Sequence, residues 1–407
     1  MQFFTRALAL AAAVVPFLAQ AAPVAGTRAG ELVPGKWIVR LKPEADVATI
    51  AAHHVKVREI HARNIARRDV AEEETGGVER EYGFGGFKGY AGAFDIATVE
   101  ELKNRPEVLS VEADSIMTIL ELVTQENAPW GLASISSRTN GATSYTYDSS
   151  AGTGHFNYVV DTGIRTTHQE FAGRAQWGYN AVNTNNADSQ GHGTHVSGTI
   201  AGLTYGVAKN ATLIAVKVFE GSSGTASTVI AGFDWAVNDI VAQSRQTTAV
   251  VNLSLGGAGS PTWDAAISAA WAAGVLAVAA AGNENQPADT RSPARSPEAL
   301  TVGNVQSNDA RYGGASGSNY GPAVDVFAAG TDILSAYRTS DVATARLSGT
   351  SMACPHVAGL VSYVRGVEGP MTAEVVKARV LELATKGRVT DAKGSANLLA
   401  FNGVGEV

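Results

Sequence analysis

Cysteine is nearly absent from this chain of 407 residues, which contains only Cys354. A single cysteine excludes an intramolecular disulfide and a cysteine-based zinc site. Charged residues are also sparse, at 17%, whereas hydrophobic residues make up 45%. That balance allows a large core and argues against intrinsic disorder. The formal net charge of −7 argues against nucleic acid as a partner, because phosphates bind basic surfaces.

Apolar runs long enough to cross a membrane are missing as well. The run at residues 8–18 is too short to span a bilayer. Arg6 precedes this run, and the small-residue cleavage signature Ala19-Gln20-Ala21 follows it, so residues 1–21 are predicted to be a secretory signal. The alternative is a buried N-terminal helix. We therefore expect a secreted, extracellular protein without a membrane anchor.

Residues 22–120 differ in character from the rest of the chain. Strand-like and helix-like patterns follow one another there in the order strand, helix, strand, strand, helix, strand, with the clearest segments at 37–41, 47–54, 87–96, 98–104 and 108–112. This order is typical of a split βαβ, ferredoxin-like α+β domain. A domain of about 80 ordered residues buries a limited core, so we expect it to be marginally stable alone.

From residue 121 the composition becomes richer in glycine, alanine, serine and asparagine. Near-continuous apolar runs recur at 156–160, 213–219, 249–255 and 275–280, as expected for parallel strands covered on both faces. Helical spacing is found between them at 225–243 and 261–273. The alternation predicts an α/β fold, a mainly parallel sheet with helices on both faces. Ligands of such sheets bind beyond the carboxyl ends of the strands, so the residues there are the candidates for chemistry.

An aspartate stands at the end of the first of these runs, in Asp161-Thr162-Gly163. A buried carboxylate is costly unless donors surround it, and a histidine ring N–H is one such donor. The alternative is a turn residue that caps its own loop.

A histidine opens a predicted helix, in Gly191-His192-Gly193-Thr194-His195. Imidazole is a general base near neutral pH without large tuning, and His192 is the candidate. His195 is expected one turn deeper in the helix, in a structural role. A zinc-binding pair is the alternative, but no H-E-x-x-H glutamate accompanies these two histidines.

An asparagine and a serine stand at two further junctions. Asn283 follows the run 275–280, and its amide could donate to a developing oxyanion; a turn asparagine is the alternative.

Ser351 lies at the start of a predicted helix, where the hydroxyl is accessible and the helix N-terminus adds N–H groups and positive potential. A plain N-cap serine is the alternative.

Together the four residues fill complementary roles: orienter, base, nucleophile and oxyanion donor. The chain order Asp, His, Ser is the subtilisin order and differs from the chymotrypsin and α/β-hydrolase orders. The four roles together favour a serine protease, and two other functions are weighed against it. A secreted serine esterase calls for a G-x-S-x-G elbow, whose second glycine is missing from Gly349-Thr350-Ser351-Met352-Ala353. A non-catalytic binding protein would have lost one of Asp161, His192 or Ser351.

With these motifs the chain resembles the subtilisin-like serine proteases, or subtilases, and within them the proteinase K branch with its secreted fungal alkaline proteases. The resemblance covers nearly the whole chain. It rests on Val159-Val160-Asp161-Thr162-Gly163, Gly191-His192-Gly193-Thr194-His195-Val196-Ser197-Gly198-Thr199, Ala280-Ala281-Gly282-Asn283 and Ser348-Gly349-Thr350-Ser351-Met352-Ala353. The segment Ala128-Pro129-Trp130-Gly131-Leu132 matches the start of mature fungal members.

This resemblance implies a serine endopeptidase acting on proteins and peptides. Ser351 would attack the scissile carbonyl, His192 would take its proton, and Asp161 would orient the imidazole. Asn283 and the Ser351 backbone N–H would hold the oxyanion. Residues 22–120 resemble the family's inhibitory propeptide, an intramolecular chaperone and inhibitor, which leaves residues 121–407 as the catalytic domain of a monomeric enzyme.

The resemblance also implies how substrates bind. Ser254, Leu255 and Gly256 resemble the segment that pairs with the substrate as an added strand, and Ser223 and Gly224 resemble the facing segment. Small residues such as Ala280 and Gly282 wall the P1 pocket, which implies broad specificity with a preference for large apolar P1 residues. Self-cleavage is expected near Leu120-Glu121, which would place Leu120 in that pocket.

Structural calcium is a further implication. Pro297 and Ala299 through backbone carbonyls, and Asp325 through its carboxylate, match one calcium site of the family; an ordinary loop is the alternative. At a second family site Arg138 stands where a small oxygen ligand is expected, so that site is expected to be broken.

Two sequons are present. Asn210-Ala211-Thr212 is predicted to be a glycosylation site on a loop. Asn252-Leu253-Ser254 is predicted to stay unmodified, because it lies on a strand edge in the cleft.

Overall fold

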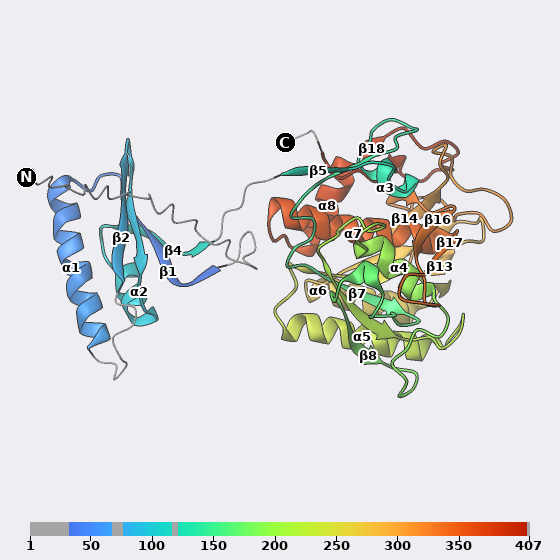
Figure 1. Ribbon diagram of the computed structural model, residues 1–407, viewed down its shortest axis with the longest axis horizontal. Helices are drawn as coiled ribbons and strands as arrows, with labels where there is room; N and C mark the ends of the chain where they lie inside the picture. Colours follow the sequence, from blue (N-terminus) through green and yellow to red (C-terminus); the bar gives the residue numbers. More distant parts are fainter. Residues whose placement is uncertain (1–31, 67–75, 116–120, 405–407) are drawn as a thin grey trace, which may run out of the picture. The chain divides into compact units, whose positions relative to one another are not determined.

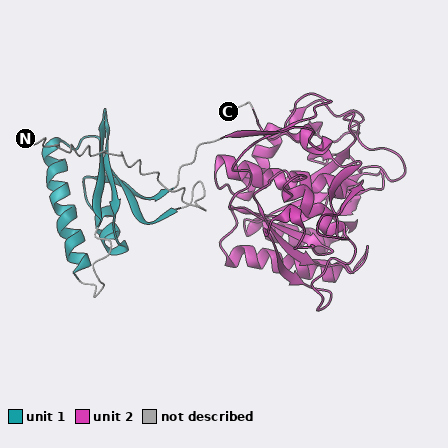
Figure 2. Ribbon diagram, in the orientation of Figure 1, with its two compact units in different colours: residues 1–116 teal, residues 117–407 magenta. Residues whose placement is uncertain are grey.

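The computed structural model describes residues 32–66, 76–115 and 121–404. The chain divides into two compact units, residues 1–116 and 117–407 (Figure 2). The predicted signal segment 1–21 and Leu120 lie outside the described residues. No helix in the described ranges is both long and apolar enough to cross a membrane.

The first unit is an antiparallel sheet with two helices packed on one face. Its strands follow the order β2-β3-β1-β4. The elements are β1 (Leu32–Leu41), α1 (Val47–Ile65), β2 (Gly77–Phe84), β3 (Phe87–Ala93), α2 (Ile96–Lys103) and β4 (Val108–Ser115). Val57 of α1 and Leu102 of α2 share a core with Val39 and Tyr90 of the sheet. The predicted order of strands and helices is confirmed.

Helix α1 is longer than the predicted 47–54. It begins at an Asp46 cap, whose carboxylate accepts from Thr49 N at 2.7 Å. It then continues to Ile65 because further apolar positions, Val57 and Ile60, also face the core.

The second unit is built on a nine-stranded sheet in the order β18-β19-β15-β14-β12-β10-β7-β9-β8. All neighbouring strands are parallel except β18 and β19. This confirms the predicted α/β class. The strands are β7 (Phe156–Asp161), β8 (Ala175–Asn180), β9 (Thr212–Lys217), β10 (Ala249–Leu253), β12 (Leu276–Ala280), β14 (Leu300–Val305), β15 (Val326–Ala329), β18 (Thr385–Lys386) and β19 (Leu398–Leu399).

Helices cover both faces of this sheet (Figure 1). One face carries α3 (Trp130–Ile135), α4 (His192–Ala201), α7 (Thr350–Glu368) and α8 (Ala373–Leu383). The other face carries α5 (Ala226–Ala242) and α6 (Pro261–Ala272). Strand β7 shows why its run is continuously apolar: Val159 packs in the first core, whereas Tyr158 and Val160 pack in the second. Each face of the strand is therefore buried.

Three short hairpin-like pairs and two 3₁₀ turns complete the unit. They are β5 (Leu122–Gln125) with β6 (Tyr145–Asp148), β11 (Gly257–Ala258) with β13 (Arg291–Ser292), β16 (Ile333–Ala336) with β17 (Thr344–Leu347), η1 (Gln169–Phe171) and η2 (Ala288–Thr290). Strand β10 ends at Leu253, two residues before the predicted end. Its last parallel pair joins Leu253 to Ala279, and the chain then leaves the sheet.

Helix α7 is the central element of the second unit. Every residue from Met352 to Arg365 is buried. The helix packs against α4 and against β10, β12, β14 and β15. A side chain in its first turn is thereby held by the whole sheet.

Candidate active site

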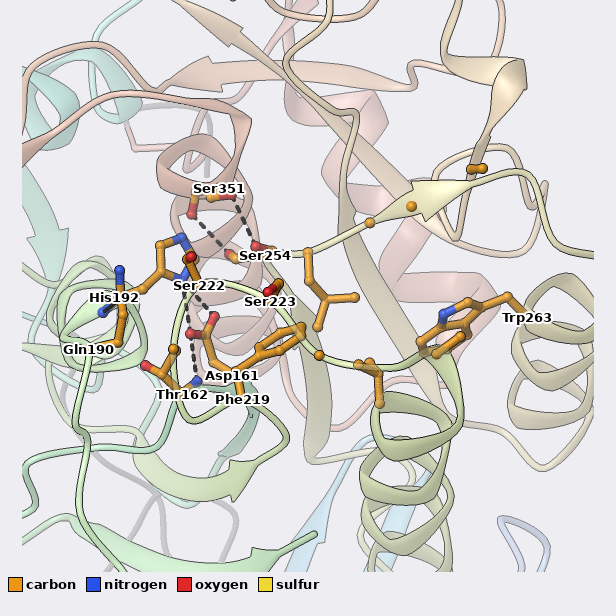
Figure 3. A pocket seen from close by; sticks show the side chains of 18 of the residues that line it. Asp161, Thr162, Gln190, His192, Phe219, Ser222, Ser223, Ser254, Trp263 and Ser351 are labelled. Carbon is orange, nitrogen blue, oxygen red and sulfur yellow. Dashed lines mark hydrogen bonds and ion pairs between the residues drawn. The ribbon is translucent and has the colours of Figure 1, made fainter. Parts of the chain in front are cut away.

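The four residues singled out in the sequence gather at the carboxyl edge of the parallel sheet. Asp161 is the last residue of β7, and His192 is the first residue of α4. Asn283 follows β12, and Ser351 lies in the first turn of α7. Figure 3 shows the His192 ring between the Ser351 side chain and the Asp161 carboxylate.

Asp161 and His192 form a hydrogen-bonded pair. The ring atom Nδ1 lies 2.8 and 2.9 Å from the two oxygens of Asp161. The carboxylate is 1% exposed and also accepts from Thr162 N at 2.7 Å, so the predicted need for donors is met. Burial alone lowers the pKa of His192, but the nearby Asp161 carboxylate, its hydrogen bond and the charge of Asp188 together raise that pKa above its ordinary value.

A glycine after the histidine permits this close pairing. A Cβ atom at Gly193 would lie 2.2 Å from Gly163 O and 3.2 Å from Asp161 Cβ. Any side chain there would push α4 away from the loop that follows β7. The glycine that follows His192 thus has a steric reason.

Ser351 is anchored to the segment that follows β10. Its hydroxyl donates to Ser254 O at 3.0 Å, and the Ser254 hydroxyl donates to Ser351 O at 2.9 Å. In this state the Ser351 hydroxyl is directed to Ser254, not to His192. Catalytic hydrogen bonds commonly tighten only when substrate binds.

Asn283 is fixed through its amide oxygen. Oδ1 accepts from Thr350 N at 2.8 Å and from Thr350 Oγ1 at 3.0 Å, which leaves the Nδ2 donor for a substrate oxygen. Asn319 supports the same loop, because it accepts from Glu284 N at 3.1 Å and donates to Ala281 O at 2.9 Å.

The sequence reasoning missed Asp188. Its buried carboxylate accepts from Thr162 Oγ1 at 2.8 Å, Gly191 N at 2.7 Å and Gln190 N at 3.1 Å, and from both Thr194 N and Thr194 Oγ1. It therefore joins the residue after Asp161 to the start of the helix that carries His192. Its position four residues before His192 was the available signal.

Other reactive side chains nearby are structural. His195 is fully buried, and its Nε2 lies 2.9 Å from Ile333 O. Burial lowers its pKa to about 4, which makes it a poor base at neutral pH. Burial likewise raises the pKa of Cys354 to about 12, and its thiol donates to Val278 O at 3.3 Å.

The predicted substrate-binding residues line two cavities that share Leu255, Gly256 and Ser351. The larger, of about 670 Å³, also contains Asp161, His192, Ser223, Gly224 and Ser254. The smaller, of about 190 Å³, also contains Ala280, Gly282 and Asn283. The oxyanion candidate and the small-residue wall thus belong to one pocket, next to the cavity that holds the Asp161–His192 pair.

The three residues predicted to hold calcium also lie together, but a lysine lies among them. Lys377 Nζ is 2.7 Å from Pro297 O, 2.6 Å from Ala299 O and 3.6 Å from Asp325 Oδ2. An ammonium group at these distances fills the position expected for the ion. The present side chains therefore do not fit calcium at this place.

The two sequons differ in exposure. Asn210 is exposed, and its Nδ2 donates to Ser149 O at 2.8 Å. Asn252 is fully buried in β10 and donates to Ser254 Oγ at 3.0 Å.

A buried aspartate paired with a histidine, beside a serine in a helix's first turn and with an amide donor close by, defines the class of serine hydrolases. Comparison with known proteins narrows this class. A model of the Subtilase family matches residues 158–405, and one described as Peptidase inhibitor I9 matches residues 36–120. The chain belongs to the subtilase family.

Individual relatives agree. The chain is 48% identical to Alkaline protease 1 of Aspergillus clavatus, over 99% of this chain and 100% of that one. It is 49% identical to an alkaline proteinase of Hapsidospora chrysogena, over 98% and 99% of the two chains. Among solved structures, a cold-adapted subtilisin-like serine proteinase matches with a TM-score of 0.63 at 40% identity, covering 68% of this chain and 99% of that chain. The protein is a serine endopeptidase made as a zymogen, with its own inhibitor domain ahead of the catalytic unit.

Proposed function

We propose that Ser351, His192, Asp161 and Asn283 form the catalytic centre of this endopeptidase. The observation that carries the proposal is the bidentate contact of His192 Nδ1 with Asp161, in the same cavity as the Ser351 hydroxyl. The contact fixes the tautomer in which Nε2 is the free base and stabilises the imidazolium that forms.

The reaction proceeds by acyl transfer. Ser351 Oγ attacks the scissile carbonyl as His192 Nε2 accepts its proton, and the oxyanion is held by Asn283 Nδ2 and the Ser351 backbone N–H. His192 then gives that proton to the leaving amine. Water then loses a proton to the same nitrogen as it attacks the acyl carbonyl, and His192 returns that proton to Ser351 Oγ as the acid product leaves.

Substrates bind as extended strands. Ser254, Leu255 and Gly256 follow β10, lie outside any strand assigned to the described residues and line the larger cavity, so we assign their backbone groups to pairing with a peptide of any sequence. Ser223 and Gly224 line the same cavity. The pocket at Ala280 and Gly282 takes the P1 side chain, and its small residues leave room for a large apolar group.

The precursor is secreted after removal of residues 1–21 and cleaves itself near Leu120-Glu121. The released residues 22–120 stay bound as inhibitor until they are degraded. The mature enzyme, residues 121–407, is a monomer that is glycosylated at Asn210.

Expression of the full chain tests this proposal. The wild type should convert to a mature form that begins near Glu121 and digests casein, whereas Ser351→Ala should remain at precursor length. Ser268→Ala, on the exposed side of α6, is the matched control and should mature like the wild type. A Ser351→Ala protein that matures in isolation would refute the assignment. Peptides that differ only at P1 then test the specificity: leucine and phenylalanine should exceed glycine and aspartate in kcat/KM.

A further inference from the structure

Lys377 projects from α8 into a cluster of oxygen atoms. Its ammonium group donates to Pro297 O and Ala299 O at 2.7 and 2.6 Å, and it lies 3.6 Å from Asp325 Oδ2. The side chain is only 14% exposed. These two carbonyls and this carboxylate are the oxygens for which the sequence predicted a calcium ion.

The chemistry of the cluster suits an ammonium group. Lysine offers three N–H donors and no acceptor, and the site presents three oxygen ligands. Calcium takes six to eight oxygens at about 2.3–2.6 Å, so an ion here would need water ligands in addition to these three oxygens. The +1 charge of Lys377 is balanced by Asp325. An ion and Nζ cannot occupy the same position.

Asp325 is itself held in place. Its Oδ2 accepts from Thr301 N, in β14, at 2.8 Å. Burial raises the pKa of Asp325, and the charge of Lys377 acts against that rise. The cluster therefore joins α8 to the loop before β14 and to the residue that precedes β15.

We propose that the Lys377 ammonium serves as the structural cation of this site. The stability of the mature enzyme is therefore independent of calcium at this site. Structural calcium is common among subtilases, so this would be a local replacement of an ion by a side chain.

A second protein cation supports the proposal. Arg138 stands where the other calcium site of the family was expected, and its guanidinium donates to Leu383 O and Thr385 Oγ1, each at 3.1 Å. The guanidinium also lies 4.1 Å from the centre of the Phe401 ring. At this second position, as at Lys377, a protein side chain binds the oxygens, and here it holds the C-terminal end of α8.

The test measures Tm of the mature enzyme, blocked by a serine-reactive sulfonyl fluoride, in chelator and in excess calcium chloride. Lys377→Ala leaves the half-buried Asp325 without its cationic partner, so Tm in chelator should fall by roughly 5 to 10 °C. Calcium should restore much of that loss, because the vacated oxygens become available. Lys386→Ala, at an exposed lysine in β18, should behave like the wild type in both media.

Asp325→Asn, with Lys377 intact, gives a second arm if Lys377→Ala does not fold. It should lower Tm by a similar amount in both media and leave the difference between the media as in the wild type. The proposal is overturned if the wild type loses stability in chelator and Asp325→Asn abolishes that loss. It is also overturned if Lys377→Ala is as stable as the wild type in chelator.

Discussion

The hydroxyl of Ser351 donates to the main-chain oxygen of Ser254 at 3.0 Å, and the hydroxyl of Ser254 donates to the main-chain oxygen of Ser351 at 2.9 Å. The two serines, far apart in sequence, thus hold each other reciprocally. One is the proposed nucleophile, and the other begins the segment proposed to pair with the substrate. A peptide that enters the cleft therefore meets the nucleophile and its anchor together.

Ser254→Ala should lower stability. The change leaves Ser351 O and the buried Asn252 Nδ2 without their partner, and each such loss costs about 1–3 kcal/mol. Thermal unfolding of the inhibitor-blocked enzyme should show a Tm several degrees lower, whereas Ser268→Ala should leave Tm unchanged. An unaltered Tm in Ser254→Ala would mean that the Ser254 hydroxyl contributes nothing to stability.

Asn283→Asp separates the two roles of the asparagine amide, which accepts from Thr350 through Oδ1 and is proposed to donate to the oxyanion through Nδ2. The carboxylate keeps an acceptor for Thr350 N, but it replaces the Nδ2 donor by an oxygen that repels the oxyanion. We expect kcat to fall by about 10² to 10³ with little change in KM; this range is the one measured for the corresponding loss in subtilisin, a member of this family. Steady-state kinetics on a chromogenic peptide measures both constants. A rise in KM with kcat unchanged would place Asn283 in substrate binding instead.

Asp188→Asn should move the pH dependence of the reaction. The Asp188 charge helps to raise the pKa of His192, so its removal lowers that pKa. His192 must be neutral to act as a base, and the acid limb of kcat/KM should therefore shift to lower pH. A purely structural role would lower the rate without moving the limb. Asp289→Asn, at an exposed carboxylate, is the control.

Acid should destabilise the catalytic unit through two buried histidines. Burial lowers the pKa of His195 and of His356 to about 4, below the value of about 6.5 in an unfolded chain. Above pH 6.5 both imidazoles are neutral in the folded and the unfolded chain. As the pH falls towards 4, the unfolded chain binds protons that the folded chain does not, and the free energy of unfolding falls by about 3 kcal/mol for each group. His192 acts in the opposite sense, because its pKa is raised.

Unfolding of the blocked enzyme between pH 6.5 and 4 checks this prediction. Tm should fall across the interval, and His356→Gln should show a shallower fall because one buried imidazole is gone. Equal slopes in the variant and the wild type would exclude His356 as a source of the effect.

The positions of the candidate site residues were predictable because they depend on strand ends. The apolar runs before Asp161 and Asn283 locate the carboxyl edge of the sheet, and the glycines around His192 and Ser351 mark tight junctions. The α/β class follows from the same runs. The order of the strands does not, because it depends on pairing between segments far apart in the chain.

Asp188 and Lys377 show what the sequence conceals. Asp188 lies in a stretch rich in asparagine and resembles a solvated loop acid; its burial is decided by donors from the loop after β7 and from α4. Lys377 resembles an ordinary surface lysine of an amphipathic helix. Its partners precede it by 52 to 80 residues, and only the packing of α8 brings them together.

The burial of α7 also determines where the enzyme can be cleaved by other copies of itself. In the proposed binding mode, one enzyme molecule cleaves another where the chain of the second can extend as a strand in the cleft of the first. Residues 352–365 cannot be offered in this way without opening the whole sheet, whereas residues 220–227 are all exposed beside the cleft. Self-digestion should therefore begin in that rim, and the lifetime of the mature enzyme should depend on the rigidity of a surface loop more than on the strength of its core.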